Sequence, residues 1–400
     1  MNKIMFTADA FEDYVYWQAE DRKTLKRINT LIEDILRNGY EGIGKPEMLK
    51  GDYQGLCSRR IDDKNRIIYK IVGDVVVLFA CRMHYKDKWW YIKEEWRNPF
   101  LFCIIFLIRG TNMKKIYILG SINTDLVINT PYIPNKGETL TGSGFFTARG
   151  GKGANQAVAA ARSGGQVKFL GAVGNDLFGK EALESLNKEG INTSHVKVLD
   201  DTPTGTAMII VCEGDNRIIL DAGANHKITN MDVDNFLNRA DKGDIFLAQL
   251  ENPIEVVGYA LRKAKEKKLM TFLNPAPANK EIIPYLKYVD VLVPNEGECE
   301  LLGGEEQLKK LIPTLVVTLG SQGFKYIDKS MNCSFPCIKV KAIDTTAAGD
   351  TFLGALLAKY SKSDNLIEAA CYGSLAASIA CTRKGAQPSI PTEEEVKTYK

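Results

Sequence analysis

The sequence predicts two domains of different fold class. Residues 1–85 indicate a small α+β unit, and residues 113–400 indicate an α/β unit with a mostly parallel sheet flanked by helices. Two observations predict this division. The chain of 400 residues exceeds the roughly 100–200 residues of one ordinary domain. Short β-rich runs are grouped before residue 85, whereas apolar strands alternate with helix-like stretches after Met113, which favours a parallel sheet.

The first domain is expected to begin with a helix and continue with strands. Apolar residues recur at helical spacing before a stop at Gly39, namely Leu25, Ile28, Ile32, Ile35 and Leu36. The predicted strands are Cys57–Ile61, Arg66–Val72 and Val75–Met83. The short polar segments between these strands predict hairpin turns. The pattern therefore predicts a compact α+β unit.

Residues 86–112 fit neither domain and are predicted to form a linker. An aromatic and charged stretch precedes an apolar run of nine residues, Phe100–Ile108. A membrane-spanning helix needs about 20 apolar residues, so no membrane anchor is expected. The segment either packs on a neighbouring domain or is poorly ordered. A third interpretation is translated intergenic sequence, with Met113 as the native start of a second protein.

The second domain is predicted to contain buried parallel strands and a separate hairpin. Its apolar strands are Ile116–Leu119, Ile245–Leu247, Val289–Val293 and Leu315–Val317. The segments Ala207–Val211 and Arg217–Leu220 flank a polar turn and predict an antiparallel hairpin set apart from the main sheet.

Composition excludes several classes of protein. With 45% hydrophobic and 25% charged residues, the chain is neither disordered nor of low complexity. The nine cysteines contain no C-x-x-C pair, so reduced thiols and a cytoplasmic location are expected rather than a disulfide framework or a zinc site. The net charge of +3 lies in residues 1–112, which hold 19 basic and 16 acidic residues. That excess is weak support for a nucleic-acid partner.

Three glycine-rich segments, 150–156, 318–323 and 344–352, stand out in the second domain. None is a Walker A loop or a dinucleotide fingerprint. In the last segment, Ala347, Ala348 and Gly349 precede Asp350 and a helix-like stretch, Phe352–Tyr360. A tight turn at a helix N-terminus directs backbone N–H groups at one point, which suits a phosphoryl group, while Asp350 could accept a proton from an attacking hydroxyl. The alternative is an ordinary helix cap.

Six motifs in order carry a resemblance to a known family. They are Gly120–Asp125, GGKGANQAVAAARSG at 150–164, Asn274–Ala278, Pro294–Glu296, DTTAAGDTF at 344–352 and Thr382–Ser389. Together they resemble the PfkB sugar kinases, and among these the ribokinases, from Met113 to near the C-terminus. The resemblance implies a ribokinase-like α/β fold with a small β lid, formed by strands at 139–147 and 207–220. It also implies ATP-dependent phosphorylation of D-ribose at O5.

The resemblance assigns roles to individual residues. Asp350 would deprotonate the sugar hydroxyl, and Ala347, Ala348 and Gly349 would form the anion hole. The sugar would contact Asn123, Asp125, Gly151, Lys152, Asn155 and Glu251, and a paired acid and amide suit a polyol. ATP would contact Asn295, Thr318, Leu319, Gly320, Ser321, Gln322 and Gly323, besides Gly349 and Asp350. Glu298 would organise Mg²⁺, and a monovalent cation, K⁺, would lie near Asp344, Thr346, Ala380, Arg383, Gly385 and Ser389.

Other interpretations of the second domain remain open at this point. A kinase for deoxyribose or for a nucleoside is the alternative within the family. The resemblance also implies a homodimer formed through the lid. His195 and His226 have no evident partner in the sequence and are expected to be structural.

The first domain carries a second resemblance. Its segments Asp13–Gln18, Lys45–Lys50, Ser58–Arg60, Asn65–Tyr69 and Cys81–Tyr85 are similar to the YoeB toxins of the RelE superfamily, which are ribosome-dependent endoribonucleases. The resemblance implies Glu47 as general base, Arg66 as the cation that steadies the phosphate, His84 as general acid and Tyr85 as an RNA-positioning residue. Lys50, Arg59 and Arg60 would contact ribosomal RNA phosphates, and a YefM-like antitoxin would be the protein partner.

The tail of the chain bears on this second activity. In the toxin family the His-Tyr pair stands at or near the end of the chain, whereas 315 residues follow Tyr85 here. We therefore expect a toxin fold whose access to the ribosome and mRNA is hindered. The remaining alternatives are an endoribonuclease with the kinase as a passenger, and a fusion without a catalytic purpose.

Overall fold

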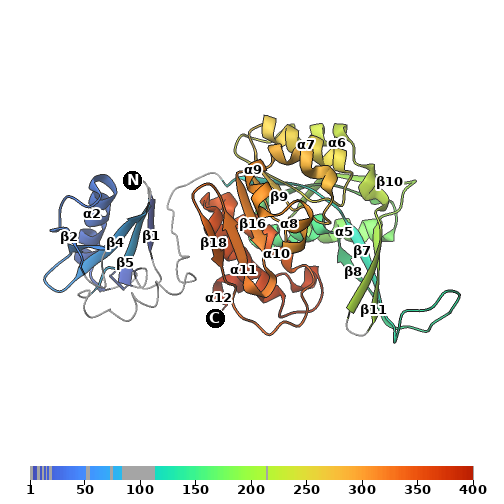
Figure 1. Ribbon diagram of the computed structural model, residues 1–400, viewed down its shortest axis with the longest axis horizontal. Coiled ribbons are helices and arrows are strands. Elements are labelled where there is room, and N and C mark those ends of the chain that lie inside the picture. The colour runs from blue at the N-terminus through green and yellow to red at the C-terminus, as the bar shows by residue number, and fades with distance from the viewer. Residues whose placement is uncertain are drawn as a thin grey trace. The chain divides into compact units, whose positions relative to one another are not determined.

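The computed structural model divides into two compact units, Met1–Gly110 and Thr111–Lys400, each taken by itself below (Figure 1). The structure describes residues 3–6, 10, 13–14, 16–17, 20–50, 55–72, 75–82, 113–212 and 215–399. The predicted linker 86–112 and the predicted toxin residues His84 and Tyr85 lie outside these ranges. Within the described ranges, no helix is long and apolar enough to cross a membrane.

The N-terminal unit is a five-stranded sheet packed against one long helix, which confirms the predicted α+β class. Its strands are β1 (Lys3–Phe6), β2 (Glu47–Met48), β3 (Cys57–Arg60), β4 (Arg66–Val72) and β5 (Val75–Ala80). Their order is β1-β5-β4-β3-β2, and only the β1–β5 pair is parallel. The sheet therefore brings β2 and β4 to the two sides of β3.

Helix α2 (Arg22–Asn38) lies where the periodicity predicts it. Asp21 caps its N-terminus by accepting a hydrogen bond from the Lys23 backbone N–H. Gly39 ends it with a positive φ of 66°, a conformation that glycine adopts without strain. One face of the helix is buried against the sheet through Ile28, Leu31 and Ile35.

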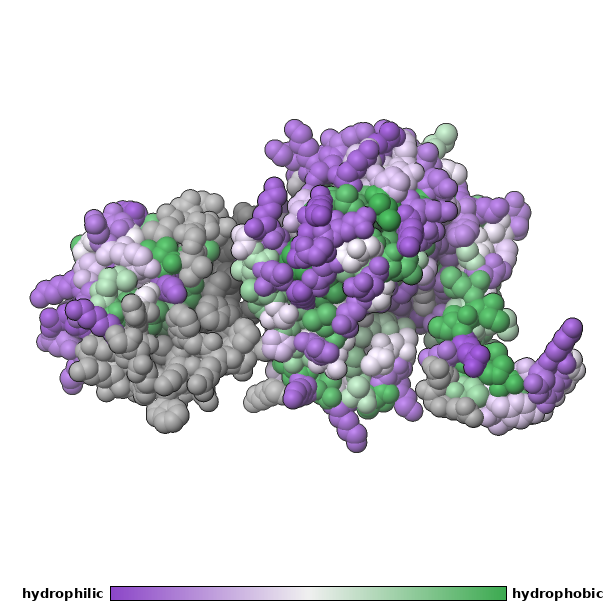
Figure 2. Space-filling model, in the orientation of Figure 1, coloured by the Kyte–Doolittle hydropathy of each residue, from purple (hydrophilic) through white to green (hydrophobic). Residues whose placement is uncertain are grey.

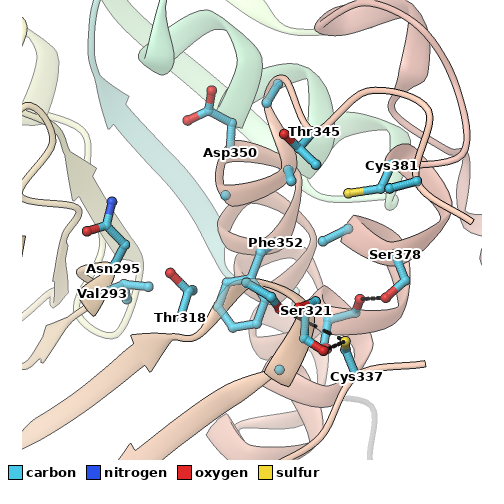
Figure 3. Close-up of a pocket in the computed structure, with 18 of the residues that line it drawn as sticks. Val293, Asn295, Thr318, Ser321, Cys337, Thr345, Asp350, Phe352, Ser378 and Cys381 are labelled. Atoms are coloured by element: carbon cyan, nitrogen blue, oxygen red, sulfur yellow. Dashed lines mark hydrogen bonds between the residues drawn. The ribbon is translucent and has the colours of Figure 1, made fainter. Parts of the chain in front are cut away.

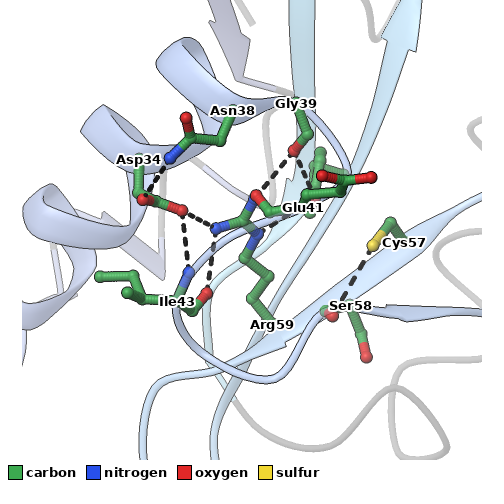
Figure 4. Close-up of polar contacts among 9 residues, drawn as sticks. Asp34, Asn38, Gly39, Glu41, Ile43, Cys57, Ser58 and Arg59 are labelled. Atoms are coloured by element: carbon green, nitrogen blue, oxygen red, sulfur yellow. Dashed lines mark hydrogen bonds and ion pairs between the residues drawn. The ribbon is translucent and has the colours of Figure 1, made fainter.

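Arg59 on β3 is fully buried and ties the sheet to the end of helix α2 (Figure 4). Its Nε–H donates to the Tyr69 hydroxyl at 3.1 Å. Its two terminal nitrogens donate to the carbonyls of Ile43, Gly39 and Glu41 at 2.9, 2.8 and 2.6 Å, and to the Asp34 carboxylate. All five N–H donors of the guanidinium are thus used. Burial acts against the Asp34 charge, but the bonds from Arg59 and neighbouring groups hold the pKa of Asp34 below its usual value.

The predicted contact of Arg59 with ribosomal RNA is therefore wrong. A side chain with no exposed surface and no free donor cannot reach a phosphate. The other two basic residues predicted with it are accessible: Lys50 is exposed, and Arg60 is half-buried beside Asp63. Arg59 instead holds the loop that leads from helix α2 to Glu47.

The C-terminal unit is built on a nine-stranded sheet of mostly parallel strands, as predicted. The strand order is β10-β9-β6-β13-β14-β15-β16-β17-β18, and only the pairs that involve β17 are antiparallel. The strands are β6 (Lys115–Leu119), β9 (Gln166–Gly174), β10 (Asn192–Leu199), β13 (Ile245–Ala248), β14 (Met270–Leu273), β15 (Val291–Leu292), β16 (Thr314–Thr318), β17 (Phe324–Ile327) and β18 (Asn332–Phe335).

Helices cover both faces of this sheet, so successive residues of β6 enter different cores. Ile116 and Ile118 join one core, and Tyr117 and Leu119 join the other. The first core contains α4 (Lys152–Arg162), α5 (Leu177–Lys188), α10 (Ala348–Ser363) and α11 (Leu366–Ala380). The second contains α6 (Asn230–Leu237), α7 (Ile254–Glu266), α8 (Glu296–Leu301) and α9 (Glu305–Leu311), and α12 (Glu393–Thr398) packs beside α11.

A separate four-stranded sheet confirms the predicted lid. Its strands are β7 (Asn123–Asn129), β8 (Ser143–Gly150), β11 (Gly205–Cys212) and β12 (Asp215–Asp221), in the order β12-β11-β7-β8. Hydrophobic side chains gather on this sheet (Figure 2), where Phe145, Phe146, Met208, Ile218 and Ile219 are exposed. Three residues separate the end of β6 at Leu119 from the start of β7 at Asn123, so the chain passes from the main sheet into the lid at this point.

Replacing Arg59 by methionine tests its structural role. The substitution leaves the Asp34 carboxylate and several carbonyl oxygens without their donor, so we expect the N-terminal unit to lose about 3–5 kcal/mol of unfolding free energy. Arg60→Met is the matched control, because its pairing with exposed Asp63 should contribute less than about 1 kcal/mol. Hydrogen exchange of the full chain would report each unit separately. Equal effects of the two substitutions would contradict this role for Arg59.

Candidate active site

Asp350 lies in the first turn of helix α10 and is only 8% exposed. The turn before it bends sharply, because Ala347 adopts a left-handed conformation with φ of 58°. The Ala348 N–H donates to the Thr345 carbonyl at 3.1 Å. A Cβ added to Gly349 would meet no atom within 4 Å, so the space beside this helix end is open. The first N–H groups of a helix lack partners within the helix and carry the positive end of its dipole.

Helix α4 holds the Asp350 carboxylate from the other side. The Asn155 Nδ2 donates to Oδ2 of Asp350 at 3.0 Å. The Gln156 Nε2 donates to Oδ1 of Asp350 at 2.9 Å. Each carboxylate oxygen therefore accepts one amide hydrogen bond and retains capacity for another donor.

Strand β7 brings Asn123 and Asp125 to the same region. Asn123 is 4% exposed, and its Oδ1 accepts a hydrogen bond from Asn225 Nδ2 at 2.7 Å. Gly150 on the paired strand leaves room for Asp125, since a Cβ there would come within 2.4 Å of the Asp125 carboxylate. Asn123 and Asp125 therefore sit at the junction of the lid and the main sheet.

Glu251, from the loop after β13, contacts the start of helix α4. Its Oε2 accepts a hydrogen bond from the Lys152 backbone N–H at 3.0 Å and another from the Ser121 hydroxyl. Gly151 precedes α4 with φ of 89°, and a Cβ at this position would strike the Asn123 backbone N at 2.8 Å. The glycine thus lets the two chains approach.

The charges at this site interact strongly. Burial, together with the carboxylates of Glu251 and Asp350, raises the pKa of Asp125 to about 6. Burial acts to lower the pKa of Lys152, but the surrounding carboxylates outweigh it, and the pKa is raised. Burial also raises the pKa of Glu298. The Asp125 carboxylate therefore lies within electrostatic reach of Glu251 and Asp350.

A cavity of about 820 Å³ opens beside Asp350 (Figure 3). Figure 3 shows Asp350 at the head of α10, Asn295 and Thr318 at strand ends across from it, and Ser378 and Cys381 toward the end of α11. The predicted site residues that line it are Lys152, Asn295, Glu298, Thr318, Gly320, Ser321, Gly323, Ala347, Ala348, Gly349 and Asp350. The cavity also has an apolar part that includes Val293, Ile338, Val340 and Ala377.

Two predicted nucleotide positions are placed differently from the others. The Leu319 side chain packs against the core of the sheet face that carries α7. Gln322 belongs to the 3₁₀ turn Gly320–Gln322 and is exposed, outside the residues that line the cavity. Asn295 and Glu298 form a capping box at the start of α8, in which each backbone N–H donates to the other side chain at 2.8 Å.

Several predicted cation positions are joined around Asp344. Its Oδ1 accepts from the Thr346 backbone N–H at 2.9 Å, and its Oδ2 accepts from the Gly385 N–H at 2.8 Å. These bonds connect the loop before α10 to the loop after α11. At the remaining positions, the Ala380 carbonyl accepts from the Arg383 N–H, the Arg383 side chain pairs with Glu395, and the Ser389 hydroxyl donates to Ala386.

Sequence reasoning missed the polar residues that support this site. Asn225 holds Asn123, Ser121 holds Glu251, and the Gln156 Oε1 accepts from Gln249 Nε2 at 2.7 Å. Gln156 belongs to a recognised motif but received no role of its own. Ser121 also belongs to a recognised motif, Gly120–Asp125, and received no role, whereas Asn225 and Gln249 are common polar residues that no spacing in the sequence marks. The two predicted structural histidines, His195 and His226, contribute no contact to Asp350 or to the cavity beside it.

In the N-terminal unit, the structure brings together two of the four predicted catalytic residues. The Arg66 guanidinium lies 3.7 Å from the Glu47 carboxylate and donates to the Ser58 hydroxyl at 3.2 Å. The pair follows from the sheet order, because Glu47 on β2 and Arg66 on β4 flank β3. Glu47 is exposed, so this ion pair is accessible to a ligand.

Comparison with known proteins finds a matching family for each unit. Residues 113–393 match the pfkB family carbohydrate kinases, and residues 6–85 match the YoeB-like toxins of bacterial type II toxin-antitoxin systems. The ribokinase of Haemophilus influenzae is 40% identical over 300 residues, which cover 72% of this chain and 98% of that protein. The deoxyribokinase of Salmonella typhimurium is 34% identical over 299 residues, which cover 71% of this chain and 98% of that protein.

Solved structures agree with these relatives. The ribokinase of Thermotoga maritima has a TM-score of 0.64 at 38% identity, and the match covers 71% of this chain and 98% of that one. The ribokinase of Arabidopsis thaliana, complexed with ribose and ATP, has a TM-score of 0.64 at 28% identity over 71% of this chain and 97% of that one. The chain therefore belongs to the ribokinase group of the PfkB carbohydrate kinases, and it carries a YoeB-like toxin domain at its N-terminus.

Proposed function

We propose that this chain transfers the γ-phosphoryl group of ATP to O5 of D-ribose, giving ribose 5-phosphate and ADP. The observation that carries the proposal is the position of Asp350. Its carboxylate lies at the head of a helix, beside an 820 Å³ cavity, and within electrostatic reach of the sugar-side residue Asp125. ATP as co-substrate also fits the cytoplasmic setting that the sequence predicts.

The reaction can be written with Asp350 as general base. Its carboxylate accepts the proton of the ribose 5-hydroxyl as the oxygen forms a bond to the γ-phosphorus. The bond between that phosphorus and the β–γ bridging oxygen breaks, and ADP leaves with the bond's electrons. The N–H groups at the head of α10 would bind the oxygens of the phosphoryl group in transit.

The polar groups near Asp350 suit a polyol. Asn155 is 6% exposed and its Oδ1 has no hydrogen-bond partner among the described residues, so it offers an acceptor to a sugar hydroxyl. The carboxylates of Asp125 and Glu251 offer further acceptors, and Lys152 offers donors. A ligand with several hydroxyls satisfies such a mixed set without adding charge.

The donor atoms present also fit the two proposed cations. Glu298 lines the cavity with a carboxylate, the ligand that Mg²⁺ prefers, and the phosphate oxygens and water would complete its shell. Bound there, Mg²⁺ would neutralise phosphate charge. The Asp344 carboxylate and the Thr346 hydroxyl, which are hydrogen-bonded to each other, offer oxygen ligands, which suit K⁺.

Two alternatives within the family remain distinguishable by substrate. The similarity to a deoxyribokinase supports deoxyribose as the first alternative, and a nucleoside is the second. Parallel assays with ribose, deoxyribose and a nucleoside would rank them by kcat/KM. We also propose that the enzyme forms a homodimer through the lid, which is supported by the exposed apolar side chains of Phe145, Met208 and Ile219.

Asp350→Asn tests the kinase assignment. The amide keeps the shape of the side chain but cannot accept the proton, so we expect kcat to fall about 10²–10⁴-fold with little change in KM. Asp234→Asn on the exposed face of α6 is the matched control and should retain full activity. ADP release that depends on ribose is the measurement. Unchanged release by the Asp350 variant would refute the assignment of Asp350 as the base.

Asp125→Asn should raise stability and weaken sugar binding together. Because the pKa of Asp125 is raised to about 6 in the fold and lies near 4 in an unfolded chain, the folded chain retains this proton over that interval. Stability therefore falls as pH rises from about 4 to about 6. We expect the variant to gain roughly 2–4 °C in melting temperature at pH 8, little at pH 4, and a higher KM for ribose. A gain that is equal at both pH values would contradict this account.

We propose a second activity for the N-terminal unit, endoribonuclease cleavage of mRNA on the ribosome, with a YefM-like antitoxin as its partner. The ion pair of Glu47 and Arg66 supports it, because a base beside a cation suits attack of a 2′-hydroxyl on its phosphate. The 315 residues that follow Tyr85 would hinder docking on the ribosome.

Glu47→Gln tests this second activity. We expect residues 1–85 to cleave mRNA in a translating extract, the full chain to cleave at least about tenfold more slowly, and Glu47→Gln to abolish cleavage by either. Glu33→Gln on the exposed side of α2 is the control and should cleave normally. Primer extension on the mRNA measures each rate. Equal rates for the two chain lengths would refute the hindrance, and no cleavage by residues 1–85 would refute the endoribonuclease.

A further inference from the structure

Three amide side chains, two of them fully buried, form a connected chain behind Asp350. Gln249 Nε2 donates to Gln156 Oε1 at 2.7 Å. Gln156 Nε2 donates in turn to Asp350 Oδ1 at 2.9 Å and to Asn274 Oδ1 at 3.0 Å. Both Gln156 and Gln249 have no exposed surface. These side chains come from α4, the end of β13 and the end of β14, so the chain links three elements to the head of α10.

A backbone carbonyl fixes the orientation of the Asn274 amide, and Asn274 in turn orients Gln156. Asn274 Nδ2 donates to the Val293 carbonyl at 2.9 Å, so its Oδ1 must face Gln156 as an acceptor. Gln156 therefore presents its NH₂ group to two acceptors, Asn274 and Asp350, and its oxygen to Gln249. Flipping Gln156 would place its oxygen against both acceptors and its NH₂ against the donor Gln249. Gln156 is thereby locked with both N–H donors toward acceptors.

The consequences for Asp350 follow from its two oxygens. Gln156 donates to Oδ1 and Asn155 donates to Oδ2, so the plane of the carboxylate is set by two amides on adjacent residues of α4. Hydrogen bonds that donate to a carboxylate favour its charged form, which is the form able to accept a proton. Gln156 is fully buried and does not line the cavity, so it has no access to a substrate.

We propose that Gln156, oriented by Gln249, is a positioning residue that directs the Asp350 carboxylate at the hydroxyl to be phosphorylated. This inference rests on the proposed kinase function. It assigns to the interior of α4 a role in the proton transfer that is separate from sugar binding. Asn155 touches the sugar side of the site, whereas Gln156 acts only through Asp350.

The test is the pH dependence of kcat in two variants of the full chain. Gln156→Met keeps the length of the side chain and removes the donors, so we expect kcat at pH 7 to fall about tenfold while KM for ribose and ATP changes less. The acid limb of the profile is the range over which kcat falls as the pH is lowered. It should shift to higher pH by about one unit, because the charged carboxylate has lost a hydrogen-bond donor. Gln156→Glu also adds a like charge and should move the limb further.

Other charged groups face Asp350 and must be separated from this effect. They are Asp125 from β7, Lys152 from α4 and Glu298 from α8, while Glu251 from the loop after β13 acts on Asp125 and Lys152. Measuring kcat at saturating ribose keeps the sugar-side groups engaged by the substrate. Repeating Gln156→Met on an Asp125→Asn background should give the same shift of the acid limb.

Two further variants complete the design. Gln249→Met removes only the group that orients Gln156, so a smaller shift in the same direction is expected. Gln166→Met, at the exposed start of β9, is the matched control and should leave the profile unchanged. The position of the limb does not depend on how much of a variant is folded, so a partly unfolded preparation still gives a clear answer.

The outcomes separate this inference from the function on which it rests. If Asp350→Asn abolishes phosphorylation while Gln156→Met and Gln156→Glu keep the limb of the unsubstituted enzyme, the positioning role is wrong and the kinase assignment stands. If Asp350→Asn leaves phosphorylation intact, the proposed base itself is wrong. Limbs that rise in the order unsubstituted, Gln156→Met, Gln156→Glu support the inference.

Discussion

The close approach of helices α4 and α10 is the contact on which the candidate active site depends. Gly354 lies where the helices meet, and a Cβ there would come within 2.3 Å of the Gln156 carbonyl oxygen. A side chain at this position would therefore push the helices apart. Asp350 lies four residues earlier on α10, hence on the same face of the helix. The contact that requires Gly354 thus also brings Asn155 and Gln156 within hydrogen-bonding distance of Asp350, so packing and the orientation of the carboxylate arise from one feature.

This arrangement places several carboxylates close together. Glu251 and Asp350 both repel the Asp125 carboxylate, and this repulsion together with burial raises the pKa of Asp125 to about 6. The Lys152 ammonium interacts with Asp350, Glu251 and Glu298. Such a cluster is stabilised by a ligand that brings hydrogen-bond donors without negative charge, as a sugar does. Repulsion among these carboxylates would therefore favour binding of a polyol over binding of an anionic metabolite.

The sequence predicted those parts of the structure that local pattern encodes. Helix α2, the hairpin strands and the head of α10 follow from hydrophobic periodicity and from small residues beside Asp350. What local pattern could not predict are contacts between distant segments: Asn225 lies 102 positions from Asn123, and Gln249 lies 93 from Gln156. For Arg59, the local pattern predicted a role that the folded structure excludes. A basic residue in a toxin-like motif suggests a surface contact, but the carbonyls that bind it converge only after the loop following α2 has folded.

Each of the two units has hydrophobic clusters built from its own residues. The hydrophobic clusters of the N-terminal unit draw on residues up to Cys81, and those of the C-terminal unit begin at Ile116. The described core of the kinase unit therefore contains no residue before Met113, and the Lys114 N–H already bonds to the Ser361 carbonyl at the end of α10. A chain that began at Met113 would keep this core intact. Two self-contained cores in one chain are expected to unfold in two steps rather than one, so loss of the buried Arg59 anchor would leave the kinase fold in place.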